Sequence, residues 1–532
     1  MQACLINPPL SVHEFPHLAL PLLKGYLQSK GIPCVVRDFN VEIMDGIIFD
    51  GFEKIQRYFF ERGIYYSLKE LRTRYQEARQ VFHSDAPVGQ KDRAQKQINT
   101  YLHIAGSHIF DICFRPDSLD TIKEGYATCD VEKDNNRIIR FIREEIIPWV
   151  REHPADVIGI SVPFTSQIFY ALILGREIKK WLPEARVVMG GPQISLFWRL
   201  FIRHKPFRQA FDALIIGMGE IAMEAFIRAV DGKTDWSAVP NLVYPDDSGE
   251  TVVNPQKEIR DMQEIPLPDF SDLPLEKYVY AKLPYQFSRG CYWGKCAFCS
   301  YRDKKGYVTR KIDVVLDHLQ EMERRYGIHS FQFIDDAIHP QLLDRMAREI
   351  LNRGMRIRYD AYLRLEAGFT EEVCLRLRRS GLHTVLFGFE SANQRLLNLM
   401  NKGNTPQNML CVLKNMHNAG VQSILSCLIG FPTETREEAW DSIRFLRDNR
   451  RYFYWAYIVH FGMISDMRSH SADYGVTDLD ETKLIRYDDS GFVALGYPYR
   501  TTCGMSVEEA LETIKEGRQA LGIQIFHDNF FS

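Results

Sequence analysis

Two stretches of the chain alternate strands with helices, and this alternation limits the possible folds more than any other feature. In the first stretch, short apolar runs alternate with runs of helical spacing over residues 4–37 and again over 156–230. In the second stretch the same alternation repeats over residues 285–461. A helix between two strands returns the chain to the same end of the sheet, so the strands run parallel. The sequence therefore predicts an α/β protein with two parallel sheets.

The first unit is predicted to be a doubly wound, Rossmann-like domain over residues 1–240. A long polar and largely helical insertion over residues 41–140 interrupts it. The predicted strands and helices of this unit are strands 4–10, 34–37, 156–163, 186–189 and 213–216, and helices 17–30, 167–182 and 220–230.

The second unit is predicted to begin after a linker over residues 241–282, in which Asp246–Gly249 has the composition of a hairpin turn. Residues 283–462 then contain six strand–helix units, a number that favours a partial (β/α)6 barrel over a closed eight-stranded one. The remaining segment, 463–532, is expected to be mainly helical, with one helix over part of 472–488 and another over 506–521, and to cover the substrate side of the barrel.

Composition narrows the class of protein. The chain has 532 residues, of which 45% are hydrophobic and 25% charged, and its net charge is −3. This balance is ordinary for a globular protein and gives no support to a nucleic-acid partner. The N-terminus has no basic region and no long apolar run, so no membrane segment is expected and a cytoplasmic location is predicted.

Three closely spaced cysteines carry the strongest chemical signal in the chain. Cys291, Cys296 and Cys299 lie within nine residues. Three thiolates hold three irons of a cubane cluster and leave the fourth iron open to another ligand. A structural zinc site is the alternative, but zinc sites of that kind use four ligands and no fourth one follows at metal spacing. A disulfide framework is disfavoured, since the 11 cysteines are an odd number and mostly isolated.

The cysteine loop resembles that of the radical S-adenosylmethionine (SAM) enzymes, in which an aromatic residue, here Phe298, precedes the last cysteine. The family usually has three residues between its first two cysteines, whereas this chain has four, Tyr292 to Lys295. The resemblance implies a [4Fe–4S] cluster whose open iron chelates SAM. It also implies reductive cleavage of SAM to a 5′-deoxyadenosyl radical, with electrons from a donor such as flavodoxin or ferredoxin.

Polar residues and glycines follow the predicted barrel strands, where the reactive groups of such barrels lie. SAM offers an ammonium group, a carboxylate, ribose hydroxyls and an adenine edge, for which carboxylates, an arginine and exposed backbone are complementary. Together with Phe298, the residues that the resemblance assigns to SAM are Asp335, Asp336, Arg364, Glu390, Ser391, Gly430 and Phe431. Arg364 and Glu390 also fit a structural ion pair between neighbouring strand ends.

Small and hydroxylated residues gather at the predicted strand ends of the first unit, where ligands of doubly wound sheets bind. With the opening Asn-Pro-Pro, a Gly-Gly turn and a Gly-x-Gly-Glu run, they resemble the cobalamin-binding domain of a large radical SAM subgroup. The residues assigned to cobalamin on this resemblance are Asn7, Pro8, Ser161, Thr165, Gly190, Gly191, Gly217, Gly219 and Glu220. The sequence has no Asp-x-His-x-x-Gly motif, which implies base-off cobalamin without a histidine from that motif. The alternative is a nucleotide-type domain that has lost its ligand.

The resemblance implies a methyltransferase of natural product biosynthesis. It would methylate an unactivated carbon of a peptide or small precursor, using methylcobalamin and a 5′-deoxyadenosyl radical, with no catalytic side chain beyond the cofactor ligands. A radical cyclase, ring-contraction enzyme or oxidase with the same cofactors is the second hypothesis. A cobalamin or redox sensor is the third, against which stand the six strand units with polar groups at successive ends.

Overall fold

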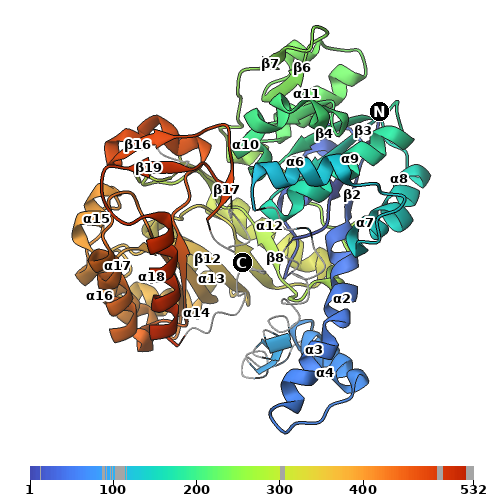
Figure 1. Ribbon diagram of the computed structural model, residues 1–532. Coiled ribbons are helices and arrows are strands. Elements are labelled where there is room, and N and C mark those ends of the chain that lie inside the picture. Colours follow the sequence, from blue (N-terminus) through green and yellow to red (C-terminus); the bar gives the residue numbers. More distant parts are fainter. Residues whose placement is uncertain are drawn as a thin grey trace.

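The fold consists of two α/β units joined side by side (Figure 1). It is a computed structural model that describes residues 1–11, 14–84, 86, 90, 93–95, 97–98, 100–101, 114, 117–299, 306–487 and 495–522. Within this part of the chain, each of the two predicted sheets is present. The strand–helix alternation also includes two helices that the sequence analysis did not predict, α10 (Pro192–Arg203) and α15 (Gln394–Leu399).

The first sheet has seven strands in the order β2-β1-β3-β4-β5-β6-β7. Its first five strands pair in parallel, as predicted, while β6 and β7 continue the sheet in antiparallel pairing. Its strands are β1 (Ala3–Asn7), β2 (Cys34–Asp38), β3 (Val157–Ser161), β4 (Arg186–Gly190), β5 (Ala213–Ile215), β6 (Leu242–Pro245) and β7 (Thr251–Val253).

Helices cover both faces of this sheet, which makes it doubly wound. Successive side chains of a strand point to opposite faces. Accordingly, Ala3 and Leu5 of β1 share a core with α1 (Ala19–Ser29) and α11 (Glu220–Val230). The next residues, Cys4 and Ile6, belong to a second core with α9 (Ile168–Trp181) and α10 (Pro192–Arg203).

The insertion is largely helical where the structure describes it. Figure 1 shows α3 and α4 extending away from both sheets, around an aromatic core that contains Phe52, Tyr75 and Tyr101. Among the described residues, the helices of the insertion and of the segment that follows it are α2 (Phe39–Asp50), α3 (Phe52–Phe60), α4 (Leu68–Phe82), α6 (Leu119–Thr128), α7 (Arg137–Phe141), the π-helix η1 (Ile142–Ile146) and α8 (Ile147–Glu152). Part of the insertion lies outside the described residues.

The predicted linker over 241–282 is only partly a connection. It supplies β6 and β7, and their turn is closed by hydrogen bonds between Asp246 and both Gly249 and Glu250, which confirms the predicted hairpin. The short 3₁₀ helices in and before this segment are η2 (Thr165–Gln167), η3 (Lys205–Gln209), η4 (Trp236–Ala238), η5 (Met262–Glu264) and η6 (Leu275–Lys277).

The second sheet has six strands, all parallel, in the order β15-β14-β13-β12-β11-β8. This is the open six-stranded arrangement that the sequence predicts. The strands are β8 (Leu283–Tyr285), β11 (Ser330–Phe333), β12 (Arg358–Arg364), β13 (Leu382–Glu390), β14 (Gln422–Ile429) and β15 (Trp455–His460). The helices are α12 (Ile312–Tyr326), α13 (Pro340–Asn352), α14 (Glu371–Arg379), α15 (Gln394–Leu399), α16 (Pro406–Asn418), α17 (Arg436–Asp448) and the 3₁₀ helix η7 (Arg450–Tyr452).

The segment after the second sheet differs in part from the prediction. The helix expected over part of 472–488 is wrong for the residues that the structure describes there: a 3₁₀ helix, η8 (Ser465–Tyr474), ends at Gly475, which has φ +86°, and short strands follow. These are β16 (Val476–Leu479), β17 (Ile485–Arg486), β18 (Leu495–Gly496) and β19 (Tyr499–Thr501). The second helix is confirmed as α18 (Val507–Ala520), which begins with a capping box at Ser506 and Glu509.

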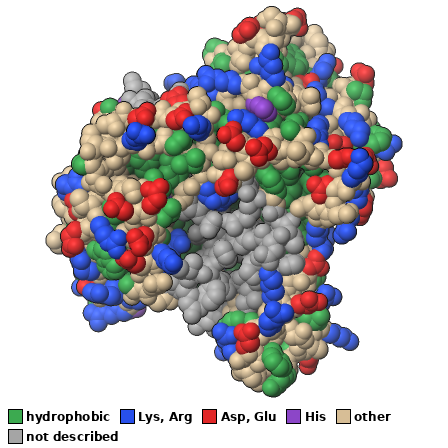
Figure 2. Space-filling model, in the orientation of Figure 1, with side chains coloured by type: hydrophobic (Ala, Val, Ile, Leu, Met, Phe, Trp, Pro, Cys, Tyr) green, Lys and Arg blue, Asp and Glu red, His purple; other side chains and the backbone are tan. Residues whose placement is uncertain are grey.

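The surface carries charges of both signs. Figure 2 shows acidic and basic side chains interspersed over the face in view, as expected from a net charge of −3. Among the helices that the structure describes, none is long and apolar enough to cross a membrane.

Candidate functional site

The cysteine loop leaves the second sheet between β8 and β11. It follows the two-residue strand β9 (Ser288–Arg289), which pairs with β10 (Val308–Thr309). Cys291 makes a parallel bridge to Ala337, just beyond β11. The loop therefore starts at the carboxyl ends of the barrel strands, where this fold holds its reactive groups.

The loop is anchored on the turn that follows α15. Ala297 N donates a hydrogen bond to Met400 O (2.8 Å), and Trp293 Nε1 donates one to Asn401 O (2.8 Å). Trp293 also fills the space beside Gly403, where a Cβ atom would lie 2.4 Å from its ring. The extra residue between the first two cysteines thus lies in a stretch with its own packing partners.

Arg364 contacts the central cysteine directly. At the end of β12, Arg364 Nη1 lies 3.5 Å from Cys296 Sγ as a donor, and the guanidinium lies 4.5 Å from the centre of the Trp293 ring. Its Nε donates to Glu366 (2.7 Å). The sequence assigned Arg364 to SAM, but these contacts direct the guanidinium toward the cysteine loop.

A second cation lies near the same thiol. Lys402 forms a buried ion pair with Glu390 (2.8 Å), and its ammonium group lies 5.7 Å from the centre of the Phe298 ring. Burial raises the pKa of the Cys296 thiol, while the charges of Lys402 and Arg364 oppose that increase. Positive charge next to a buried thiol favours the thiolate, which is the form that binds metal.

These residues fit a cubane cluster better than a single metal ion. In the described part of the chain, no three His, Cys, Asp or Glu side chains converge on a point where one ion would bind. Zinc needs such convergence. In a cubane each thiolate binds its own iron, so the thiols stay apart around the cluster. The loop supplies three thiols, of which Cys296 is buried and accepts a hydrogen bond from Arg364, while Cys291 and Cys299 are partly buried.

The carboxylates at the other strand ends are held by the protein itself. Asp335 is fully buried and accepts hydrogen bonds from Ser288 N and Oγ and from Phe287 N, so it holds the strand before the cysteines. Burial raises the pKa of Asp335 to about 7. Asp336 is exposed, and Ser391 Oγ lies 3.0 Å from Ser442 Oγ.

The structure brings Phe298 and Phe431 together. Their ring centres lie 6.3 Å apart, edge to face. Gly430, with φ +83°, precedes Phe431, and the amides of both residues donate to the buried carboxylate of Glu434. Their assignment to SAM remains a prediction, as do the other assignments of single residues to cofactors.

Sequence reasoning did not find Lys402 or Trp293. Lys402 follows a short helix and not a strand, so a search of strand ends passes over it. Trp293 lies in the cysteine spacing itself, where only the tertiary contact with Gly403 reveals its role.

The strand ends of the first unit also meet along one edge. Asn7 Nδ2 donates to Asp38 (3.0 Å), and Gln167 donates to both Asn7 Oδ1 (2.8 Å) and Pro8 O (2.6 Å). Thr165 Oγ1 lies 3.2 Å from Gln193 Oε1. Asn7 and Thr165 therefore organise the loops at this edge.

The two glycine turns are joined through Ser195. Gly217 N donates to Ser195 Oγ (3.0 Å), which in turn donates to Gly191 O (3.1 Å). Gly191 has φ +103°, and a Cβ atom there would lie 2.9 Å from Val162 N. Ser161 pairs with Gly190 at the end of β3. Only a glycine at 191 permits this close approach.

Glu220 takes part in a contact between the two units. It is the first residue of α11, directly after Gly219, and it forms a buried ion pair with Arg289 of β9. The carboxylate that the sequence assigned to cobalamin is thus bound to the strand that leads into the cysteines.

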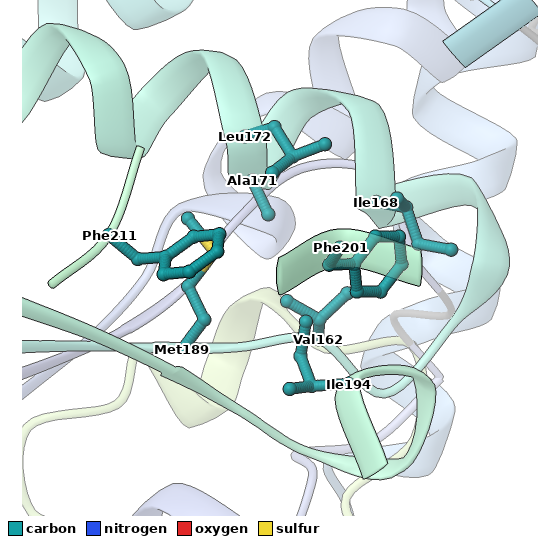
Figure 3. Close-up of a pocket in the computed structure, with 8 residues that line it drawn as sticks. All are labelled: Val162, Ile168, Ala171, Leu172, Met189, Ile194, Phe201 and Phe211. Atoms are coloured by element: carbon teal, nitrogen blue, oxygen red, sulfur yellow. The ribbon is translucent and has the colours of Figure 1, made fainter. Parts of the chain in front are cut away.

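A small internal pocket in the first unit does not suit a polar cofactor. Figure 3 shows it between α9, α10 and the sheet. All of its lining side chains are apolar, namely Val162, Ile168, Ala171, Leu172, Met189, Ile194, Phe201 and Phe211. It offers no hydrogen-bond partner and belongs to the packing of the second core.

Comparisons with known proteins agree with this architecture. The B12 binding domain model matches residues 121–227, and the Radical SAM superfamily model matches residues 285–446. An uncharacterized methyltransferase of Pyrococcus horikoshii is 30% identical over 57% of this chain and 66% of its own length. The anaerobic magnesium-protoporphyrin IX monomethyl ester cyclase of Rubrivivax gelatinosus is 26% identical over 55% of this chain and 54% of its own length.

A solved structure shares the fold. The cobalamin-dependent S-adenosylmethionine radical enzyme OxsB, with aqua-cobalamin and SAM bound, superposes with a TM-score of 0.57 at 15% identity, over 84% of this chain and 52% of that one. The chain thus spans between half and two thirds of the length of these proteins. A radical SAM domain uses a [4Fe–4S] cluster and SAM, and a B12 binding domain takes cobalamin. With both domains in this order, the chain belongs to the family of cobalamin-dependent radical SAM enzymes.

Proposed function

We propose that this enzyme is a C-methyltransferase that acts on an unactivated carbon of a peptide or small natural-product precursor. When bound, the cluster and SAM supply a radical that removes hydrogen, and the cobalamin supplies the methyl group. One matched relative is named a methyltransferase, which supports this reaction class. We also propose that an external one-electron donor, such as flavodoxin or ferredoxin, supplies the electrons for SAM cleavage.

The observation that carries the proposal is the contact between the two units. Glu220, after the Gly-x-Gly turn of the first sheet, pairs with Arg289, two residues before Cys291. The strand ends of both sheets therefore border one region. A methyl donor and a radical source in one region allow a substrate carbon to react with both in turn.

The residues of the chain have positioning roles in this proposal. Arg364 and Lys402 hold positive charge beside Cys296, and Phe298 with Phe431 forms an apolar wall next to the cysteine loop. The segment with η8 and α18 covers the barrel beside α10, α17 and β15. These groups orient ligands and exclude water.

A radical cyclase with the same cofactors is the second candidate, and the match to a cyclase of Rubrivivax gelatinosus favours it. The two reactions differ in their products from SAM. Methyl transfer by this route forms S-adenosylhomocysteine and 5′-deoxyadenosine together. Cyclisation forms 5′-deoxyadenosine without matching S-adenosylhomocysteine.

The test is SAM turnover by the full chain, reconstituted without oxygen in the presence of cobalamin and a strong reductant. Formation of both products, with cobalamin retained, supports the methyltransferase. Formation of 5′-deoxyadenosine alone supports the cyclase class. We expect Cys296→Ala to lose cluster iron and all SAM cleavage, while Cys411→Ala, at an exposed position on α16, keeps both. SAM cleavage by Cys296→Ala would contradict both candidates.

A further inference from the structure

The ion pair between Glu220 and Arg289 is buried between the two units. The exposed fractions of the two side chains are 4% and 6%. Arg289 Nε also donates to Gln286 Oε1 (3.0 Å). Transferring two charges from water into the protein costs free energy. If one partner of a buried pair is removed, the other charge is left buried without a partner, and the protein is strongly destabilised. The position of each charge therefore depends on the other.

Arg289 belongs to the segment that enters the cysteine loop. On one side, Ser288 is held by the buried Asp335, which accepts from its amide and its hydroxyl. On the other side, Gly290 has φ +77°, and a Cβ atom there would lie 3.2 Å from Gly306 O. These contacts restrict the backbone on both sides of Arg289, which lies two residues before Cys291.

Glu220 belongs to the edge of the first sheet. It follows the turn at Gly217, whose amide is bound to Ser195, and Gly219, where a Cβ atom would lie 3.3 Å from the Leu23 side chain. The carboxylate is thus attached to the strand ends that the sequence assigns to cobalamin. Its partner in the structure is the protein cation Arg289.

A further buried arginine strengthens this junction. Arg310, just after β10, donates to Met262 O (2.8 Å) and Ile265 O (2.7 Å), which belong to the connection between the two units. Two buried arginines and two buried carboxylates, Arg289, Arg310, Glu220 and Asp335, thus lie around one short strand pair.

We propose that Glu220 and Arg289 act as a charge clamp that sets the position of the cysteine loop relative to the carboxyl edge of the first sheet. The clamp would fix the distance from cluster to cobalamin, and with it the coupling between hydrogen removal and methyl transfer. Both are positioning residues. The coupling part of this inference rests on the proposed function, whereas the positional part does not.

The positional part is tested on the full chain without cofactors, by hydrogen exchange. In Glu220→Gln, which keeps the shape but removes the charge, we expect faster exchange over 285–299 and 217–224 and unchanged exchange in β13 and β14. Asp344→Asn is the matched control, since it breaks an ion pair with Arg376 (2.6 Å) between the outer helices α13 and α14. Unchanged exchange over 285–299 in Glu220→Gln would overturn the proposal.

The distance is tested on the reconstituted enzyme by pulsed EPR between cob(II)alamin and the reduced cluster. We expect Glu220→Gln and Arg289→Gln to broaden the distance distribution while iron and cobalamin contents are kept. S-adenosylhomocysteine formed per 5′-deoxyadenosine should fall roughly 10- to 100-fold, as for an ångström-scale misplacement. The double variant Glu220→Arg with Arg289→Glu should restore part of both signals.

The outcomes separate this inference from the proposed function. If the wild type forms no S-adenosylhomocysteine but the variants still change the exchange and the distance, the methyltransferase proposal fails and the clamp stands. If the wild type transfers methyl groups and the variants match it in distance and coupling, the clamp is refuted. A uniform loss of stability in the single variants, unrelieved in the swapped variant, would also refute it, since that result indicates general folding support.

Discussion

At the scale of single residues, the contacts of Arg364 show what a cation at the end of a strand binds in this structure. It donates to Cys296 Sγ, to Glu366 and to Lys402 O, and it stacks on Trp293. Hydrogen bonds to cluster sulfurs and nearby charge set the reduction potential of iron–sulfur clusters. Arg364 therefore supports Cys296 as a cluster ligand, independently of any contact that it makes with SAM.

We expect Arg364→Gln to weaken the cluster. Loss of a partner behind a metal ligand usually costs about 10-fold or more in metal affinity or activity. The measurement is iron content per chain and the reduction potential of the cluster by EPR-monitored titration. Arg376→Gln, far from the cysteines on α14, is the control. A variant with wild-type iron content and potential would show that the contact with Cys296 is incidental.

A second prediction at the scale of single residues concerns the stability effects of alanine at the adjacent glycines 190 and 191. Gly191→Ala should destabilise the protein by about 2 kcal/mol or more, because its φ of +103° and the nearby Val162 backbone both oppose a side chain. Gly190→Ala should have little effect on stability, since its Cβ would lie 3.6 Å or more from its neighbours. Chemical denaturation measures both. Equal stability losses would refute this interpretation of the turn.

At the scale of elements, the loop between β14 and α17 is held by a buried acid. Glu434 accepts from the amides of Gly430 and Phe431. Burial nonetheless raises the pKa of its carboxyl to about 8. The carboxyl binds its proton more tightly in the folded state, so its stabilisation is full below pH 4.5 and is lost as the pH rises through about 8.

We therefore expect the wild type to lose more thermal stability than Glu434→Gln between pH 6 and 9, by about 1 kcal/mol, which is about 1 °C in Tm for a chain of this length. Glu438→Gln is the control: the Arg395 side chain lowers the pKa of Glu438 to about 2, so its stabilisation is lost only as the pH falls below 4.5. Calorimetry at several pH values makes the comparison. Parallel curves for wild type and Glu434→Gln would show that the acid is ionised throughout.

At the scale of the whole molecule, polar contacts link the two units at more than one point. Asp38, at the end of β2, accepts from Asn7, from Val41 N and from Tyr278 OH (2.6 Å). Tyr278 lies shortly before β8, the first strand of the second sheet. One buried carboxylate thus joins the edge of the first unit to the entry of the second.

We expect Tyr278→Phe to destabilise the chain by about 1–3 kcal/mol, because it leaves the buried Asp38 with one donor fewer. Tyr244→Phe, on β6 near the far edge of the first sheet from Asp38, is the matched control and should change stability by less than about 0.5 kcal/mol. Urea denaturation measures both. If the two variants behave alike, the Asp38 network does not contribute to joining the units.

How much of the site follows from sequence depends on the distance between its parts along the chain. The three thiols lie within nine residues, and each strand-end residue follows its strand directly, so local pattern alone finds them. The partner of a strand-end charge is not local. Glu220 and Arg364 were both assigned to cofactors, yet they contact Arg289 and Cys296, which lie 69 and 68 residues away.

By itself, the sequence determined the parallel strands of the two sheets, though not the antiparallel β6 and β7, and it determined the three-cysteine loop, because hydrophobic period and ligand spacing are set by neighbouring residues. Tertiary structure alone decided which charges meet: Arg364 and Lys402 beside Cys296, and Glu220 against Arg289. It also replaced the helix predicted over part of 472–488 with a 3₁₀ helix and strands. The reason is that burial makes an unpaired charge costly, and only the folded chain specifies which groups are buried together.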